Sequence, residues 1–466
     1  MSLFTDGYTD NLNFLTSHLA TGENFDCIER HLLVGGRDVC FFYVDGFVKD
    51  GEMQRVMQTL LSQKSLGRAE DLLLTLPYVE ASLTSDREEA VVAVLSGQTL
   101  ILAEGFGDTA LLVDARTYPA RGTEEPSSDR VMQGARDGFV ETLVSNTALI
   151  RRRIRDPRLR MHHTRIGSSS GTDVVMCYVE GVAKPELVAE IREKLEGIKT
   201  KSLSLGYRSL AEALVRRGWL NPFPKIRTTE RPDTAAAQLL EGSVLIICDT
   251  SPQVMILPTA IFDFLQQTDD YYFPPLTGTY LRIVRTLILL LSVIVTPLWY
   301  LAVENAARLP EELLFLIPRE PGALPIILQL LLVEVAVDGL KIASMNTPDM
   351  LSNSLSVIGA LILGDFAVTV GWLSADVILY MAFVSIASFA QQNAELGYAF
   401  KFMRILTLVF VYGFGVWGLL LGGAVMLLAL ATNTSPTRGG YLFPLIPFSL
   451  KALGRLLFRT KKRDFE

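Results

Sequence analysis

Residues 283–303 limit the fold of this chain of 466 residues more than any other segment. They are almost wholly apolar, and no residue from 286 to 303 is charged. A helix of about 20 such residues crosses the hydrocarbon core of a bilayer. Arg282 and Arg285 stand at the start of the segment, and basic residues favour the cytoplasmic side of a membrane helix. The sequence therefore predicts a membrane span whose preceding region lies in the cytoplasm.

More apolar runs follow this span. They cover residues 350–372, 377–394 and 405–431, and a shorter run covers 324–337. Four spans place both chain ends in the cytoplasm, which suits the basic tail of residues 436–466. The segment 324–340 is then re-entrant or lies in the membrane interface. A fifth span there would put the basic tail outside, so we expect four.

Three acidic residues lie within these apolar regions. Glu334 and Asp338 are four residues apart and share one helix face. A charge deep in lipid costs about 2.5–3.5 kcal/mol on insertion scales, so such residues tend to face water, a partner or a pore. The two acids lie either in the headgroup layer or in an acidic ring at a cation pathway. Asp365 lies within a span-length run and is near a pore, paired with a cation such as Lys341, or neutral.

The run around Asp365 is also a candidate inner wall of an oligomer. Gly359 and Gly364 allow helices to approach closely. Hydrophobic constrictions close channels by dewetting, which makes the neighbouring apolar side chains candidates for a gate. These residues are Val357, Ile358 and Leu361. The alternative is that they are ordinary packing or lipid-facing residues.

The region before the first span contains two similar halves. DVCFFYVDGFVKDGEMQRVMQTL, from Asp38, matches DVVMCYVEGVAKPELVAEIREKL, from Asp173, in an apolar strand, an acidic-Gly turn and an amphipathic helix. A second pair of segments, at 96–105 and 241–250, has a glycine before a buried strand in both copies. Two unrelated strand-turn-helix pieces are the alternative. We expect tandem cytosolic α/β subdomains at 1–135 and 136–275, an α-helical multipass membrane domain at 276–435, and a cytoplasmic tail at 436–466.

The composition argues against several classes of function. The net charge of −7 gives no sign of nucleic-acid binding. The four cysteines, Cys27, Cys40, Cys177 and Cys248, form no CxxC pair and are predicted to be buried, reduced thiols. With four histidines in the whole chain, and His162 and His163 adjacent, we expect no metal site and no cofactor. The sequence contains no HExxH or Walker A motif, so we do not expect an enzyme.

Two polar segments of the N-terminal region are distinctive. A basic run contains Arg151, Arg152, Arg153, Arg155, Arg158 and Arg160. This run is solvated or self-paired, or it faces an anionic membrane surface or an acidic partner. The second segment is Thr229, Glu230, Arg231, Pro232 and Asp233. It reads as the start of a helix, with a proline in the first turn and an acid near the positive end, and a direct ligand role is the alternative.

Motifs spread along the chain resemble those of the GerA family of spore germination proteins, A-subunit type. They are Pro222-Phe223-Pro224, the 229–233 segment, Leu239 to Gly242, Asp249, Ser251-Pro252, Pro258, the Asp269-Asp270-Tyr271-Tyr272 run and Asn146 to Arg153. Asn346-Thr347-Pro348 and Gly364-Asp365 look more like the stage V sporulation protein AF branch than the nutrient-receptor branch of that family.

The resemblance implies a multipass protein of the bacterial cell membrane or the spore inner membrane. It also implies a homo-oligomeric ion channel that opens during germination, with a B-type transporter-like subunit as partner. We therefore expect a channel subunit that releases cations. A non-conducting docking or signalling subunit of a germinant receptor is one alternative. A solute transporter is another, although no inverted repeat is visible.

Overall fold

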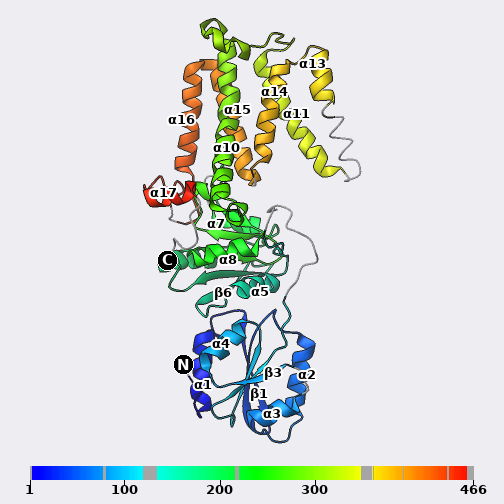
Figure 1. The fold of residues 1–466 in the computed structure, drawn as a ribbon, viewed down its shortest axis with the longest axis vertical. Coiled ribbons are helices and arrows are strands. Elements are labelled where there is room, and N and C mark those ends of the chain that lie inside the picture. Colours follow the sequence, from blue (N-terminus) through cyan, green and yellow to red (C-terminus); the bar gives the residue numbers. More distant parts are fainter. Residues whose placement is uncertain are drawn as a thin grey trace. The chain divides into compact units, whose positions relative to one another are not determined.

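The computed structural model describes residues 3–76, 80–118, 134–215, 220–347, 359, 361–391, 393–437 and 440–458 (Figure 1). The chain forms two compact units. The first contains Met1–Arg216, Ile226–Thr259 and Ser435–Gly439, and the second contains Arg217–Lys225, Ala260–Thr434 and Gly440–Glu466. Residues 220–225 and 260–275 thus pack with the helical unit rather than with the second α/β subdomain, where the sequence placed them. The expected domain limits are otherwise predictions.

The first half of the N-terminal unit is a five-stranded antiparallel sheet with helices on both faces (Figure 1). Its strand order is β1-β2-β4-β5-β3. The strands are β1 (Cys27–Val34), β2 (Arg37–Val44), β3 (Ala81–Thr84), β4 (Thr99–Ala103) and β5 (Ala110–Val113). The helices α1 (Tyr8–Leu19) and α4 (Arg87–Leu95) pack on one face, and α2 (Asp50–Leu61) and α3 (Ala69–Thr75) pack on the other. Successive residues of β2 alternate between the two cores, as the two-residue period of a strand requires.

The second half repeats this plan. Its strand order is β6-β7-β9-β10-β8, which is the order of the first sheet, strand for strand. The strands are β6 (Leu159–Ile166), β7 (Thr172–Val179), β8 (Arg227–Thr229), β9 (Val244–Cys248) and β10 (Val254–Leu257). The helices α5 (Leu143–Arg153) and α8 (Pro232–Leu240) cover one face, and α6 (Pro185–Glu196) and α7 (Tyr207–Leu214) cover the other. The shared order is what a tandem repeat predicts.

The sequence match between the halves falls at equivalent places in the two sheets. Gly46 follows β2 and Gly181 follows β7, with φ angles of 80° and 79°. Only glycine takes this left-handed conformation readily, so the turn keeps it in both copies. Lys49 and Lys184 are the N-cap residues of α2 and α6. A local backbone requirement therefore made the repeat visible in the sequence.

The second unit is helical. Its long helices are α10 (Pro275–Glu304), α11 (Ile326–Asn346), α14 (Ala375–Phe389), α15 (Ala394–Phe414) and α16 (Val416–Thr432), followed by α17 (Leu450–Leu457). Its short helices are η1 (Ile261–Phe264), α9 (Asp269–Tyr272), η2 (Ala306–Arg308), η3 (Glu311–Leu316), η4 (Leu361–Phe366) and α13 (Ala367–Thr369). Within the described ranges, α10 is the one helix that has the length and apolar character to cross a bilayer, while Ala375–Ser388 and Val416–Thr432 are shorter apolar helices.

The prediction of one long span at 405–431 is wrong. The segment is a helical hairpin, because α15 ends at Phe414 and α16 begins at Val416. Gly415 between them has φ 56° and ψ −129°, a conformation that side chains strongly disfavour. Gly418 and Gly422 then lie directly against α15, where an added Cβ would collide with its atoms. These glycines permit the close helix contact of the hairpin.

The structure also changes the limits of the other apolar runs, while the re-entrant or interfacial position expected for 324–340 stays a prediction. The short run at 324–337 is part of α11, a helix of 21 residues that continues to Asn346. The run at 377–394 is interrupted, since α14 ends at Phe389 and α15 starts at Ala394. Of the run at 350–372, the described part contains a π-helical turn, η4, followed by the short helix α13.

Candidate functional site

Four charged side chains meet between α11 and α15. The Lys401 ammonium lies 2.6 Å from Asp338 Oδ2 and 3.6 Å from Glu334 Oε1. The Arg404 guanidinium forms a short ion pair with Glu334. The two acids are four residues apart on α11 and the two bases are three apart on α15, so each pair occupies one helix face. The arrangement is a neutral network of two anions and two cations.

The network is buried and connects three helices. Glu334 is 5% exposed and Arg404 is 4% exposed. Arg404 Nη1 also donates a hydrogen bond of 3.1 Å to the Ser292 carbonyl of α10. Buried ions are tolerated when they are paired and hydrogen-bonded, and loss of one partner leaves the other uncompensated. The two acids that sequence reasoning singled out are thus neutralised within a single subunit, and their place in an acidic ring is still a prediction.

A small polar cavity adjoins this network. It has a volume of about 130 Å³ and is lined by all four charged residues. Its other polar lining residues are Ser292, Lys341, Ser385, Ser388, Gln391 and Tyr398. Arg404 Nε and Gln391 Nε2 are buried and have no hydrogen-bond partner within the described part of the chain. Polar cavities of this kind accommodate water or ions rather than apolar groups.

Asp365 has a different environment. It lies on the π-helical turn η4, is exposed on this chain, and forms no ion pair with any residue in the described ranges. Lys341, the suggested partner, has its ammonium 4.9 Å from the centre of the Tyr398 ring. Leu361 is 45% exposed on the same turn. Val357 and Ile358, the other gate candidates, lie outside the described residues.

A second buried charge cluster lies near the N-terminal end of α10. Asp270 is fully buried and accepts hydrogen bonds from Arg282 Nε at 3.2 Å and from Arg285 Nη2 at 3.1 Å. Arg285 also donates to the Leu265 carbonyl at 3.1 Å. The Asp269-Asp270-Tyr271-Tyr272 run forms the short helix α9, which places Asp270 beside both arginines. The two arginines that mark the start of the span therefore also anchor the chain segment before it.

The 229–233 segment starts a helix, as predicted. Pro232 occupies the first turn of α8, and Asp233 lies in the same turn. Arg231 is fully buried, pairs with Asp233 at 2.7 Å and donates to the Ala135 carbonyl at 2.9 Å. The Thr229 hydroxyl accepts from the Arg231 amide at 3.1 Å, and the Glu230 carbonyl accepts from the Phe139 amide at 2.8 Å. These contacts give the segment a structural role.

The basic run is largely paired with acids of the same chain. Arg151 is fully buried and binds the carboxylate of Asp26, also fully buried, through two hydrogen bonds of 2.7 Å and 3.0 Å. Three further arginines form ion pairs with carboxylates, and Arg152 lies over the Tyr118 ring at 4.5 Å. The three pairs are Arg153 with Asp137, Arg158 with Asp156 and Arg160 with Glu180. The self-paired interpretation of the run holds for these residues.

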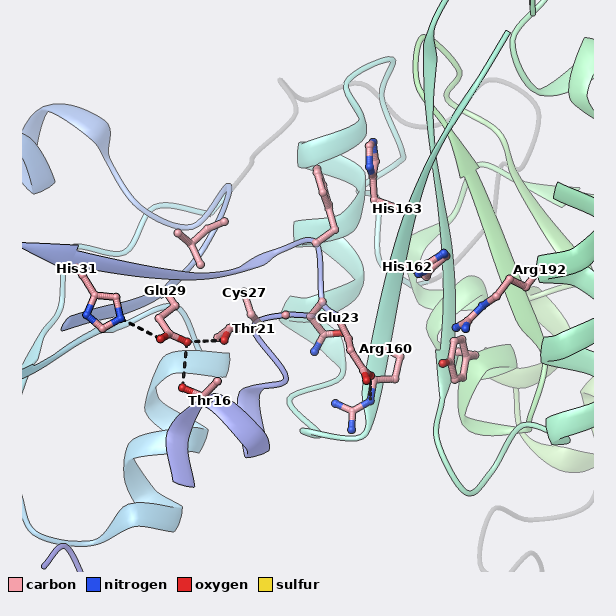
Figure 2. Close-up of a pocket in the computed structure, with 15 residues that line it drawn as sticks. Thr16, Thr21, Glu23, Cys27, Glu29, His31, Arg160, His162, His163 and Arg192 are labelled. Carbon is pink, nitrogen blue, oxygen red and sulfur yellow. Dashed lines mark hydrogen bonds and ion pairs between the residues drawn. The ribbon is translucent and has the colours of Figure 1, made fainter. Parts of the chain in front are cut away.

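A polar cleft of about 1060 Å³ lies within the N-terminal unit (Figure 2). Arg160, His162 and Arg192 line it, as do Glu29 and His31. Burial and the nearby Arg192 guanidinium hold the pKa of His162 below its usual value. Burial raises the pKa of Glu29, but hydrogen bonds from Thr21, His31 and Thr16 outweigh it and leave that pKa below its usual value. The cleft thus combines cationic and anionic groups.

The four cysteines are buried and form no disulfide, as the sequence predicts. Burial raises the pKa of the Cys27 and Cys248 thiols to about 12. A thiol with so high a pKa is protonated at neutral pH and is a poor nucleophile.

Comparison with known proteins places these features in a family. The family described as "Bacillus/Clostridium GerA spore germination protein" matches residues 14–466. The chain belongs to the GerA family. It is 37% identical to stage V sporulation protein AF of Bacillus subtilis (strain 168), over 97% of this chain and 92% of the relative. It is 30% identical to the uncharacterized membrane protein YfkQ of the same strain, over 85% of this chain and 78% of the relative.

A solved structure also matches this GerA family chain. The crystal structure is that of the N-terminal domain of the A subunit of the Bacillus megaterium spore germinant receptor GerK3. The match has 26% identity and a TM-score of 0.42, and it covers 55% of this chain and 96% of that one.

Proposed function

We propose that this GerA family chain is a membrane subunit of a spore germination complex that assembles with further copies of itself into an ion channel releasing cations. Its family membership supports the place in germination. The apolar helix α10 and the shorter apolar helices α14 and α16 support a multipass membrane domain. The observation that carries the channel proposal is that Asp365 is exposed and forms no ion pair with the described residues.

Asp365 needs a polar environment that the described residues of this chain do not supply. A carboxylate within the bilayer costs about 2.5–3.5 kcal/mol on insertion scales. Asp365 is exposed and forms no ion pair with the described residues, which supports a polar environment formed by water or another copy. Several copies would gather their carboxylates into a ring that favours cations over anions. Single π-helical turns occur often at functional sites, which fits the position of Asp365 on η4.

The proposal also assigns a gate beside Asp365 and a membrane topology based on the arginines at the start of α10. Leu361 precedes Asp365 by one helical turn and provides an apolar constriction next to the carboxylate ring, with Val357 and Ile358 as further candidates. The N-terminal α/β unit lies in the cytoplasm, on the side of Arg282 and Arg285, and the channel lies in the inner membrane of the spore. A B-type transporter-like subunit is the proposed heterologous partner.

A non-conducting docking or signalling subunit is the second candidate. Its support is the network of Glu334, Asp338, Lys401 and Arg404, which is neutral and joins helices instead of lining an open path. In a helical domain with a purely structural role, buried charges would be paired with opposite charges of the same chain in this way.

Cation flux separates the two candidates. The full-length chain is reconstituted into liposomes loaded with K⁺, and its mass in detergent is measured in parallel. We expect an oligomer, K⁺ efflux, and at least about a tenfold lower cation-to-anion permeability ratio in Asp365→Asn, since the ring would lose its charge. Asp108→Asn, in an exposed loop of the α/β unit, is the matched control and should leave the K⁺ efflux and the permeability ratio unchanged. A monomer, or equal selectivity in the two variants, would refute the shared pore and favour docking.

A further inference from the structure

Three side chains with metal-ligand chemistry converge on one face of the β1-β2 hairpin. Glu29 and His31 are two residues apart on β1, so they point to the same face of the sheet. His31 is the direct cross-strand partner of Cys40 on β2. Side chains of such directly opposite residues lie close together. The hairpin therefore places a carboxylate, an imidazole and a thiol in one cluster, although no pair of these residues has the sequence spacing of a common metal motif.

The distances suit a tetrahedral metal ion. His31 Nε2 lies 3.0 Å from Glu29 Oε1 and 3.7 Å from Cys40 Sγ. All three ligand atoms lie within 4.8 Å of one another. Zinc bonds of about 2.0–2.1 Å to nitrogen and oxygen and about 2.3 Å to sulfur would put the ligand atoms roughly 3.3–3.6 Å apart. The two His31 distances are within a few tenths of an ångström of these values, and a side-chain rotation that brings Glu29 Oε1 and Cys40 Sγ closer would complete the coordination.

The surrounding hydrogen bonds orient the two polar ligands. His31 Nδ1 lies 2.9 Å from Asp38 Oδ2, and the Tyr8 hydroxyl donates to the same oxygen at 2.7 Å. A carboxylate on the far nitrogen is the usual outer partner of a zinc-bound histidine, because it fixes the tautomer that leaves Nε2 free to bind metal. The other oxygen of Glu29, Oε2, accepts from Thr16 at 3.0 Å and from Thr21 at 2.6 Å (Figure 2). This leaves Oε1 directed at His31.

We propose that Glu29, His31 and Cys40 bind one divalent zinc ion, with Asp38 as the outer partner of His31 and the fourth position open to the polar cleft. Glu29 and His31 both line that cleft, which provides a route for the ion and space for a water ligand. Three protein ligands with one open position are typical of zinc sites that bind a further molecule. The expectation of no metal site came from the small number of histidines, but strand pairing brings one of them beside a carboxylate and a thiol.

The site also has the charge that a cation needs. Glu29 belongs to the cluster and Asp38 lies beside it, and burial together with these two carboxylates raises the pKa of Cys40. Zinc would compensate the carboxylates and bind the thiol as a thiolate, releasing a proton. The alternative is a protonated His31 held between Glu29 and Asp38, which would give the same hydrogen bonds with no metal.

Metal titration of the full-length chain in detergent distinguishes these alternatives. The purified protein is stripped with a chelator and titrated with Zn²⁺, and bound zinc is measured by elemental analysis after equilibrium dialysis. We expect one zinc per chain in the wild type and at least tenfold weaker binding in His31→Gln and Glu29→Gln. Zn²⁺ should raise the thermal unfolding midpoint of the wild type and not that of these variants.

Cobalt substitution tests the thiolate ligand. The wild type loaded with Co²⁺ should show a thiolate-to-cobalt charge-transfer band, which Cys40→Ser should abolish. Cys177→Ser, an equally buried thiol, and His18→Gln, an exposed imidazole on α1, are the matched controls and should keep full binding. A wild type without stoichiometric zinc, or a charge-transfer band that persists in Cys40→Ser, would overturn the proposal and leave the protonated imidazole as the explanation.

Discussion

The buried pair of Glu334 and Arg404 permits a quantitative test of the helix packing. Removing one partner of a buried ion pair costs about 3–5 kcal/mol, because the other charge is left uncompensated. Lys401 lies 3.6 Å from the same Glu334 oxygen and retains part of the attraction in Arg404→Gln. We therefore expect Arg404→Gln to lower the free energy of unfolding by about 3 kcal/mol, the lower end of that range.

A double-mutant cycle separates the pair from its surroundings. Glu334→Gln leaves Arg404 buried without its carboxylate and should cost a similar amount. The double variant leaves two neutral amides, so its loss should be smaller than the sum of the single losses by about 2 kcal/mol or more. The free energy is measured by reversible SDS unfolding of the full-length chain in mixed micelles.

The exposed pair of Glu52 and Arg55 on α2 is the control for this cycle. It has an N–O distance of 3.4 Å but an exposed arginine, and it should show no measurable coupling. Additivity of the Glu334→Gln and Arg404→Gln losses within about 0.5 kcal/mol would contradict the buried network.

Three further predictions concern other parts of the chain. Asp270→Asn should cost about 3–5 kcal/mol in the same unfolding assay, since two buried arginines share this carboxylate; a loss below about 1 kcal/mol would contradict the cluster. Gly418→Leu should destabilise the α15-α16 hairpin more than Gly423→Leu, which meets no neighbouring atoms, and equal losses would exclude the close contact. The pKa of His162 is lowered in the folded state, so the unfolded state binds its proton more tightly and stability falls as the pH drops below about 6.5. His162→Gln should reduce this fall in the unfolding midpoint, and an unchanged pH profile would refute the assignment.

The sequence revealed features that depend on neighbouring residues. The tandem repeat was visible because Gly46 and Gly181 serve the same left-handed turn after equivalent strands. The helix start at Pro232 was visible because proline and an acid favour the first turn. Both signals lie within a few residues of the structure they specify.

Features that depend on distant pairing were missed. Hydropathy did not distinguish Gly415, which breaks the apolar run, from the glycines that lie within α16. The spacing of Lys401 and Arg404, three residues apart, was the one available signal for the partners of Glu334 and Asp338. The sequence alone does not predict how α11 and α15 align with each other, so the pairing could not be derived. The approach of His31 to Cys40 likewise depends on the register of the β1-β2 hairpin.

The ion pair of Arg151 and Asp26 has a consequence for the duplicated N-terminal unit. Asp26 precedes the first strand of one half, Arg151 belongs to the first helix of the other, and neither contacts solvent. In a fragment that contains one half alone, the remaining Asp26 or Arg151 would lose this partner. We therefore expect each half to be less stable by itself than within the duplicated unit.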